Sequence, residues 1–206
     1  ALEETISLYL KLAVEHNLGI SMLWARYFLG SLHYERNELE QAVEQLEAVV
    51  EQRYLANFDC VRGAFTDLAL AYQAQGRARD ASATMGNLTQ VGLELEMETA
   101  VQRQAVEVRL ALARQDLDEA LRGAAQLNGI LPEAPMIWSE IPAITRAQAL
   151  LAAGGANERR QALDLLDTLE AVAEATHVWK ALVRILALQA LGFAAGKRDA
   201  EALAKL

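Results

Sequence analysis

The amino-acid sequence predicts an all-α protein, a right-handed α-solenoid of about five helix-turn-helix pairs. Three observations support this prediction. Alanine and leucine dominate the 206 residues, while residues typical of strands are sparse and proline occurs only 3 times. Apolar residues recur at helical spacing. A pattern of two helices also returns about every 40 residues, which is typical of a solenoid.

Eleven helices are expected from the apolar periodicity and from the turn residues between them. The clearest helix has one apolar stripe, at residues 39, 42, 43, 46, 49 and 50. Asn37 is its predicted N-cap, and Glu40, three residues on, is placed to complete a capping box. The expected ranges are 2–16, 20–36, 38–54, 58–75, 77–94, 97–114, 117–129, 139–153, 158–175, 178–195 and 198–206.

The helix pair that contains this stripe aligns with later segments of the chain. Its packing alanine, Ala42, corresponds to Ala81, Ala120, Ala162 and a residue at about 200, so the steps are 39, 39, 42 and roughly 38 residues. These residues have to be small because paired helices in a tight hairpin approach closely.

Turn residues mark the ends of several predicted helices. Gly76, Gly154 and Gly196 are expected where a helix ends with a left-handed residue before the chain reverses. Asp116 is the predicted N-cap of the helix that begins at 117.

One loop holds the strongest helix breakers. Pro132 and Pro135 prevent residues 128–142 from being helical throughout, while Pro142 is expected in the first turn of the next helix behind a Ser139 cap.

We therefore predict a single repeat domain over residues 1–206. Its expected repeats are 1–19 (partial), 20–56, 57–96, 97–135, 136–177 and 178–206 (partial). The first helix lacks a partner, which suggests a piece of a longer protein. Unpartnered end repeats expose apolar side chains, so fraying or self-association through the ends is expected. The side chains concerned are Ile6, Leu10, Ala13, Leu203 and Leu206.

Charge and composition exclude several classes of partner. The net charge of −9 repels phosphate, so direct binding of nucleic acid by this chain is not expected. No uncharged apolar run approaches the roughly 18 residues that span a membrane. Cys60 is the only cysteine, which excludes an internal disulfide and fits a cytoplasmic protein.

The repeat resembles the tetratricopeptide (TPR) pattern in its spacing of Leu29, Gly30, His33, Leu39 and Ala42, but its step is longer than the standard 34 residues. Three phrases, "LHYERNELEQAVEQLEAVVEQ", "LALAYQAQGRARDA" and "SEIPAITRAQALLAAGG", are similar to the helical-repeat region of large LuxR-type, MalT-like, ATP-dependent bacterial transcription regulators. The resemblance implies a TPR-like solenoid between a nucleotide-binding module and a helix-turn-helix module. Neither module is in this sequence, which has no phosphate loop of the form G-x-x-x-x-G-K-S/T and no basic recognition helix.

The sequence shows no constellation typical of catalysis. His16, His33 and His177 lie in different repeats without ligand spacing, and Cys60 has no histidine nearby in sequence. The carboxylates of "ELEME" at 94–98 are best explained as a solvated turn. We therefore expect no enzymatic activity, no cofactor and no metal.

The first helices of a TPR-like superhelix line its concave groove, and the aromatic residues of the first full repeat lie there. They allow two interpretations, a core between repeats or a patch for a peptide or small ligand. The candidate groove residues are Trp24, Tyr27, Tyr34, Thr66, Gln73 and Arg109. For Arg109, an anionic group of a ligand and an ion pair with Glu107 or Asp116 are both open.

The predicted function is an effector-sensing or protein-interaction segment of a bacterial transcription regulator, with a protein or small-molecule effector in the groove. The alternative is a general peptide-binding TPR adaptor or scaffold. A peptide receptor is expected to have a positive, polar groove, whereas the residues found here are mixed and partly apolar.

Overall fold

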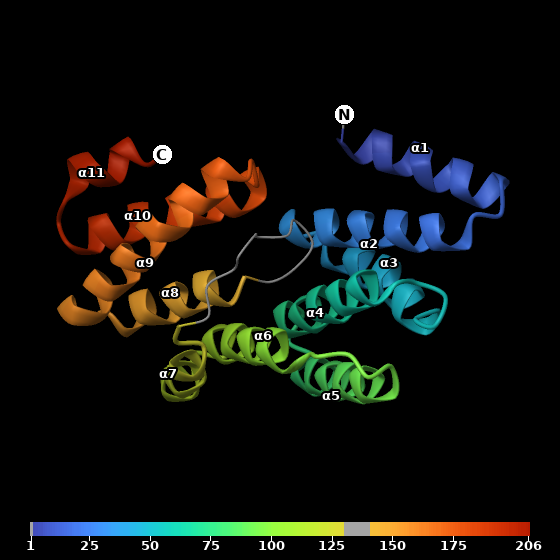
Figure 1. Cartoon of the computed structure of the whole chain (residues 1–206), viewed down its shortest axis with the longest axis horizontal. Helices are drawn as coiled ribbons and strands as arrows, with labels where there is room; N and C mark the ends of the chain where they lie inside the picture. The colour runs from blue at the N-terminus through green and yellow to red at the C-terminus, as the bar shows by residue number, and fades with distance from the viewer. Residues whose placement is uncertain (1, 130–140) are drawn as a thin grey trace. The chain divides into compact units, whose positions relative to one another are not determined.

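The computed structural model describes residues 2–129 and 141–206, and α-helix is the only regular secondary structure in those ranges (Figure 1). The all-α prediction is confirmed. The helices are α1 (Leu2–Glu15), α2 (Gly19–Glu35), α3 (Leu39–Glu51), α4 (Phe58–Ala74), α5 (Ala78–Glu94), α6 (Ala100–Ala113), α7 (Leu117–Gln126), α8 (Pro142–Ala153), α9 (Ala156–Ala175), α10 (Trp179–Ala195) and α11 (Asp199–Ala204).

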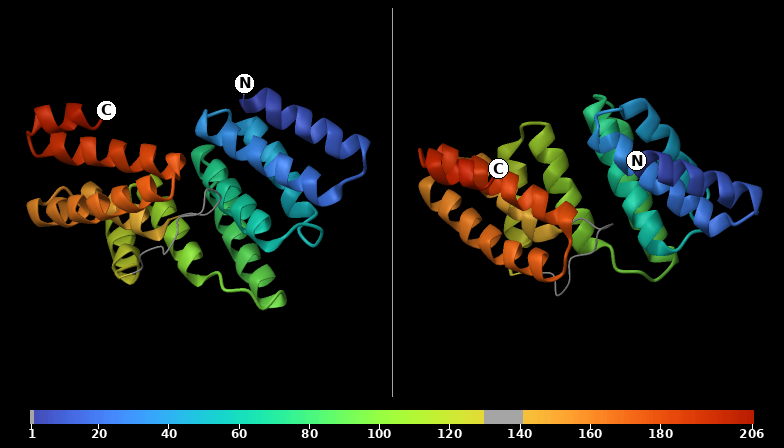
Figure 2. Two further views of the ribbon diagram at one scale, coloured as in Figure 1. Left: turned by 45° about the horizontal axis from the view of Figure 1, so that its top comes forward. Right: turned by 90° about the horizontal axis from the view of Figure 1, so that it is seen from above.

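The chain forms two compact units, Ala1–Ala100 and Val101–Leu206. In the first unit each helix from α1 to α4 packs on the next one, and α2 also packs on α4. In the second unit the helices from α7 to α11 pack in sequence in the same way, and α8 also packs on α10. Figure 2 shows α9 and α10 side by side within this unit. Within each unit these neighbouring helices are in contact, and so is one pair of first helices, α2 with α4 and α8 with α10, as stacked hairpins require.

Small residues lie where the hairpins are closest, as predicted. Ala42, Ala81, Ala120 and Ala162 are at most 1% exposed. A Cβ atom on Gly30 of α2 would lie 2.6 Å from Leu46 Cγ of α3. In the last helix pair the buried alanine is Ala202, at 7% exposed. The last step of the repeat, from Ala162 to Ala202, is therefore 40 residues rather than the predicted 38 or so.

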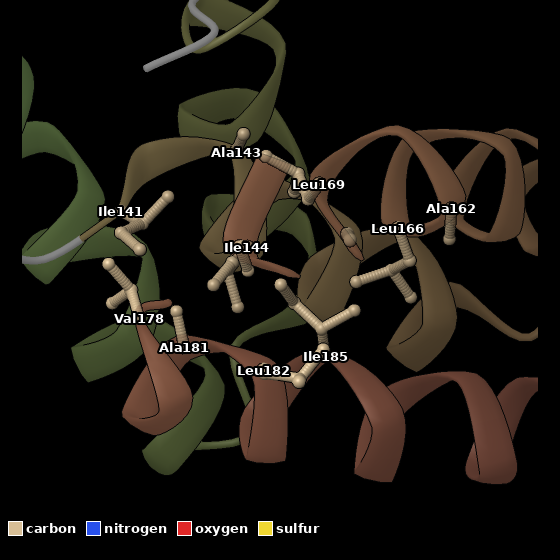
Figure 3. Packing of buried hydrophobic residues seen from close by; sticks show 12 residues of the cluster. Ile141, Ala143, Ile144, Ala162, Leu166, Leu169, Val178, Ala181, Leu182 and Ile185 are labelled. Carbon is tan, nitrogen blue, oxygen red and sulfur yellow. The ribbon is translucent and has the colours of Figure 1, made fainter. Parts of the chain in front are cut away.

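The second unit has an apolar core between α8, α9 and α10 (Figure 3). Ile144 of α8 faces Leu182 and Ile185 of α10, and Leu166 of α9 lies beside them. Ile144, Leu166 and Ile185 are at most 1% exposed. Burying such side chains fully stabilises by about 1.5–3 kcal/mol each, which fixes α10 against the preceding pair.

Most helices end in the same hydrogen-bonded turn, and this corrects the predicted role of Asn37. Asn37 has φ +61°, its N–H donates to Tyr34 O at 3.0 Å, and the Glu38 N–H donates to His33 O at 2.9 Å. This is a Schellman turn that ends α2, so Asn37 is not the N-cap of α3. Glu38 occupies that position without a side-chain hydrogen bond, so the predicted capping box is absent.

Gly76 and Gly154 have φ +77° and +74°, which confirms their predicted left-handed role. Gly196 does not, because its φ is −85° and the left-handed residue is the next one, Lys197. The Arg198 N–H donates to Phe193 O at 3.0 Å, so Lys197 completes the turn that Gly196 was expected to complete.

The predicted helix boundaries are correct to within a few residues. Asp116 caps α7 as predicted, since its carboxylate accepts from the Glu119 N–H at 2.9 Å. Helix α6 begins at Ala100 rather than 97, and the Glu98 carboxylate accepts from the Ala100 N–H at 2.6 Å in the turn before it. Helices α3 and α7 end three residues earlier than predicted, at Glu51 and Gln126.

Pro142 lies in the first turn of α8, as predicted, and Ile141 is the N-cap. Pro132, Pro135 and Ser139 lie outside the described residues.

The prediction for the chain ends needs one correction. Ile6 and Leu10 are half-buried and Ala13 is 1% exposed, because this face of α1 packs on α2. Leu203 and Leu206 are exposed, as predicted.

Candidate functional site

Three aromatic side chains of α2 form a cluster on the first unit. The Trp24 ring centroid lies 5.9 Å from that of Tyr27 in an edge-on arrangement. It lies 5.4 Å from the Phe28 centroid with 27° between the two planes, which is a stacked pair. Trp24 and Phe28 are both partly exposed. The stacked pair therefore forms a partly exposed aromatic surface.

Tyr27 lies beneath this surface. It is 3% exposed, and a Cβ atom on Gly63 of α4 would lie 2.6 Å from its Cζ and 2.7 Å from its hydroxyl oxygen. The absence of a side chain at Gly63 is what admits the ring. Thr66, which is 39 residues after Tyr27 and so occupies the equivalent place on α4, is 5% exposed. These two positions contribute to packing rather than to a surface.

Tyr34 and Gln73 are also 39 residues apart and equivalent, near the ends of α2 and α4. Both are partly exposed. The Gln73 Oε1 is buried and accepts no hydrogen bond from the described residues, so it is an acceptor in need of a donor.

Arg109 is partly exposed on α6, in the second unit. Glu107, one of its two predicted partners, accepts from Arg103 Nη1 at 2.5 Å.

The structure thus places Trp24, Tyr34 and Gln73 within one unit as partly exposed groups, and Tyr27 and Thr66 as buried ones. Sequence reasoning missed Phe28. Its spacing of four residues from Trp24 puts both on the same face of a helix, and that signal was available.

The groups that could suggest chemistry are used for packing and turns. His33 Nδ1 lies 2.6 Å from Glu38 Oε2, across the turn that follows α2. Cys60 is fully buried, and burial raises the pKa of its thiol to about 12, which suppresses the nucleophilic thiolate. Within residues 2–129 and 141–206 no group of three His, Cys, Asp or Glu side chains could hold a metal ion.

Residues 94–98 form the turn expected there. Glu94 at the end of α5 accepts from the Tyr54 hydroxyl at 2.7 Å and from Gln90 Nε2 at 3.1 Å, and these bonds hold the pKa of its carboxyl below the usual value. Glu96 is the left-handed residue of the turn, with φ +54°.

Two small pockets lie within single units. One, of about 170 Å³, lies between α6 and α7 and is lined by Gln104, Glu107, Glu119, Arg122 and Gln126. The other, of about 130 Å³, lies between α3, α4 and α5 and is lined by Arg53, Asn87, Gln90 and Glu94 with three apolar side chains. Neither lining contains a serine, cysteine or histidine, the usual nucleophiles and bases.

Antiparallel helix hairpins, small residues at the contacts and a repeat of about 40 residues define a TPR-like helical-repeat module. Such modules typically present a surface for interaction rather than a catalytic centre. A family model described as the MalT-like TPR region matches residues 3–206, and the chain belongs to this family. The resemblance inferred from the sequence is confirmed.

Other comparisons add less. No curated protein matches. One solved structure that is similar contains the nearly identical TPR-like repeats of a protein described as a kinesin light chain from Podosopora anserina. The identity is 18%, with 88% of this chain and 90% of that chain covered and a TM-score of 0.49. In the described ranges no helix is both long and apolar enough to cross a membrane.

Proposed function

We propose that this chain is the effector-sensing helical-repeat segment of a bacterial transcription regulator, acting in the cytoplasm without catalysis of its own. In this proposal a ligand on the repeats alters how they pack against a nucleotide-binding module and a helix-turn-helix module of the parent protein. Membership of the MalT-like TPR region supports the proposal, because the resemblance stated above places such repeats between those two modules.

The observation that carries the proposal is the stacked pair of Trp24 and Phe28 on α2. Tyr27, wedged against Gly63, supports the pair from below and limits its freedom to move. A rigid, partly exposed aromatic surface loses little conformational entropy when it binds a flat or apolar ligand face. Tyr34 and the unpaired oxygen of Gln73 lie on first helices of the same unit and are the polar groups proposed to orient a ligand.

Fluorine NMR of protein labelled with 5-fluorotryptophan tests this proposal. The chain has tryptophan at 24, 138 and 179, and replacement of each one assigns its resonance. Trp179 on α10 is an internal control, because it is exposed but far from α2 in sequence. The probes are a set of small polar metabolites and a set of short peptides.

We expect a small metabolite to shift the Trp24 resonance and to leave that of Trp179 unchanged. Phe28→Ala should then weaken binding about 5–150-fold, the range that corresponds to a 1–3 kcal/mol contact anchor. The proposal is wrong if no probe affects Trp24, or if Trp24→Ala leaves the affinity of a bound metabolite unchanged.

The alternative function, a peptide-binding adaptor, predicts that peptides rather than metabolites shift the Trp24 resonance. The unpaired Gln73 oxygen is the one observation that favours it, because a backbone N–H of an extended peptide is a suitable donor.

A further inference from the structure

The pocket between α3, α4 and α5 is lined by an arginine with unused hydrogen-bonding capacity. Arg53 follows the last turn of α3 and lines this pocket of about 130 Å³. A guanidinium has five N–H donors. The Nη1 of Arg53 donates to Val50 O at 3.3 Å, while its Nε is buried and donates to no group in the part of the chain that the structure describes. Because a buried donor without an acceptor is costly, this Nε–H indicates a missing acceptor.

An aromatic side chain holds the guanidinium in place. Arg53 Cζ lies 4.7 Å from the centroid of the Tyr54 ring, which is a cation–π contact. The Tyr54 hydroxyl in turn donates to Glu94 Oε2 at the end of α5, at 2.7 Å. These contacts connect the end of α3 to the end of α5. They restrict Arg53 before any ligand arrives, which lowers the entropy lost on binding.

Glu94 adds a negative charge to the same lining. The bonds it accepts come from neutral groups, the Tyr54 hydroxyl and Gln90 Nε2 at 3.1 Å. These bonds hold the pKa of its carboxyl below the usual value, so Glu94 is ionised at neutral pH. A carboxylate accepts about four hydrogen bonds, so further positions remain for a donor. Among residues 2–129 and 141–206 neither Arg53 nor Glu94 forms an ion pair, and each charge can therefore take a partner.

The rest of the lining includes an apolar wall. Phe65 of α4 and Val91 of α5 are 1% and 3% exposed, and Val50 of α3 lies with them in the lining. Sites for drug-sized molecules have volumes of about 300–1,000 Å³, well above the volume of this pocket. The pocket therefore suits a small molecule that has an apolar part and two opposite charges.

We propose that this pocket binds a zwitterionic α-amino acid with a short aliphatic side chain. Its carboxylate accepts from the Arg53 guanidinium and gives the unsatisfied Nε–H an acceptor, in the planar geometry that arginine favours. Its ammonium donates to Glu94, and its side chain lies on the apolar wall. None of the lining residues lies on α2, so this site is separate from the aromatic surface on that helix.

Proton–nitrogen NMR of the arginine Nε–H groups tests the proposal, with L-valine as the probe. The Arg53 signal is assigned by its loss in Arg53→Gln. Arg77 is the internal control, because it also stacks on a tyrosine ring, 4.1 Å from the Tyr72 centroid, but its Nε already donates to Asp80 at 2.7 Å. Two analogues of L-valine each remove one charge, since isovalerate lacks the ammonium and isobutylamine lacks the carboxylate. Saturation transfer to the ligand methyl groups follows binding to the variants.

We expect L-valine to shift the Arg53 signal and to leave that of Arg77 unchanged. Each analogue should bind about 10–100-fold more weakly, because it loses one charge-assisted interaction. Arg53→Gln should lose binding of L-valine, whereas Arg77→Gln should keep it. Glu94→Gln should weaken binding of L-valine but not of isovalerate, which has no ammonium to lose a partner.

A second variant covers the case in which Arg53→Gln lowers the melting temperature. Asn87→Tyr then replaces it, because Asn87 is an exposed residue of the lining and a larger side chain there obstructs the pocket. The proposal is overturned if L-valine leaves the Arg53 signal unmoved, or if either analogue binds as tightly as L-valine. It is also overturned if a folded Arg53→Gln or Asn87→Tyr variant binds L-valine like the parent.

Discussion

Gly30 allows a sharp test of how the hairpins pack. Replacing glycine by alanine inside a helix normally stabilises a protein by about 0.5–1 kcal/mol, because glycine loses more backbone entropy on folding. At Gly30 the new Cβ would lie 2.6 Å from Leu46 Cγ, 2.8 Å from Leu46 Cδ2 and 3.3 Å from Ala42 O. Real Cβ atoms do not approach carbon this closely, so the leucine or the whole of α3 has to move.

Overpacking of this kind typically costs about 1–3 kcal/mol. Setting a cost of about 2 kcal/mol against a gain of about 1 kcal/mol, we expect Gly30→Ala to lower the free energy of unfolding by about 1 kcal/mol. Gly86→Ala is the matched control, because Gly86 is exposed within α5 and an added Cβ there meets nothing within 4 Å. The same chemical change should therefore stabilise at Gly86 and destabilise at Gly30.

Urea unfolding followed by far-ultraviolet circular dichroism measures both variants. A third measurement isolates the cause. In a Leu46→Ala background the two closest atoms are gone and only Ala42 O at 3.3 Å remains near the new Cβ, so Gly30→Ala should become neutral or stabilising. If Gly30→Ala stabilises the parent as much as Gly86→Ala does, the close approach of α2 and α3 is not real and the packing argument fails.

Three further predictions concern single groups or the whole chain. Cys60 should resist alkylation in the native protein at mildly alkaline pH, because burial raises its pKa to about 12, and rapid labelling without denaturant would contradict this. Burial opposes the ionisation of Glu170, but the hydrogen bonds that Lys205 and Gln189 donate to it outweigh burial, so the pKa of its carboxyl lies below the usual value. A carboxyl whose pKa is lower in the folded than in the unfolded state stabilises the fold at pH values above its unfolded-state pKa. This stabilisation is lost as the pH falls through the folded-state pKa. Melting temperatures of Glu170→Gln should therefore fall less than those of the parent as the pH is lowered through the range in which glutamates titrate. The chain should not bind duplex DNA at near-physiological salt, given its net charge of −9, and a mobility shift at sub-micromolar protein would contradict that.

Much of the fold could be predicted because the same pattern of packing residues occurs in several copies along the chain. The alanines at 42, 81, 120 and 162 indicate one helix contact in four copies, and all of them are buried. The turns were harder to predict. A left-handed residue is expected to be glycine, but the fold also places Asn37, Gln115 and Lys197 there. The Schellman hydrogen bonds around them offset the steric cost, and such bonds cannot be read from residue type.

The candidate site was only partly predictable for a related reason. Periodicity shows which residues share a face of a helix, but it does not show how deep a neighbouring helix covers that face. Trp24 and Tyr27 are three residues apart on α2, but Tyr27 is buried because the absence of a side chain at Gly63 of α4 makes room for its ring. Gly63 is 39 residues after Trp24 and is its equivalent in the next repeat. The chain thus has glycine instead of an aromatic residue at the position where Tyr27 of the preceding repeat needs room.

The fit of Tyr27 against Gly63 allows mutations on α2 to distinguish a packing role from a binding role. Tyr27 is 3% exposed and fills the space above Gly63, so Tyr27→Ala should leave a cavity and cost about 3–5 kcal/mol, as for other buried aromatic residues. Trp24→Ala should cost clearly less, because that ring is partly exposed and lies at the edge of the cluster. Gly63→Ala tests the same contact from the α4 side, since its Cβ would lie within 2.9 Å of three atoms of the tyrosine side chain. Melting temperatures of the three variants decide the matter. If Tyr27→Ala and Gly63→Ala melt like the parent, Tyr27 is not a packing residue, and it returns to the binding surface together with Trp24.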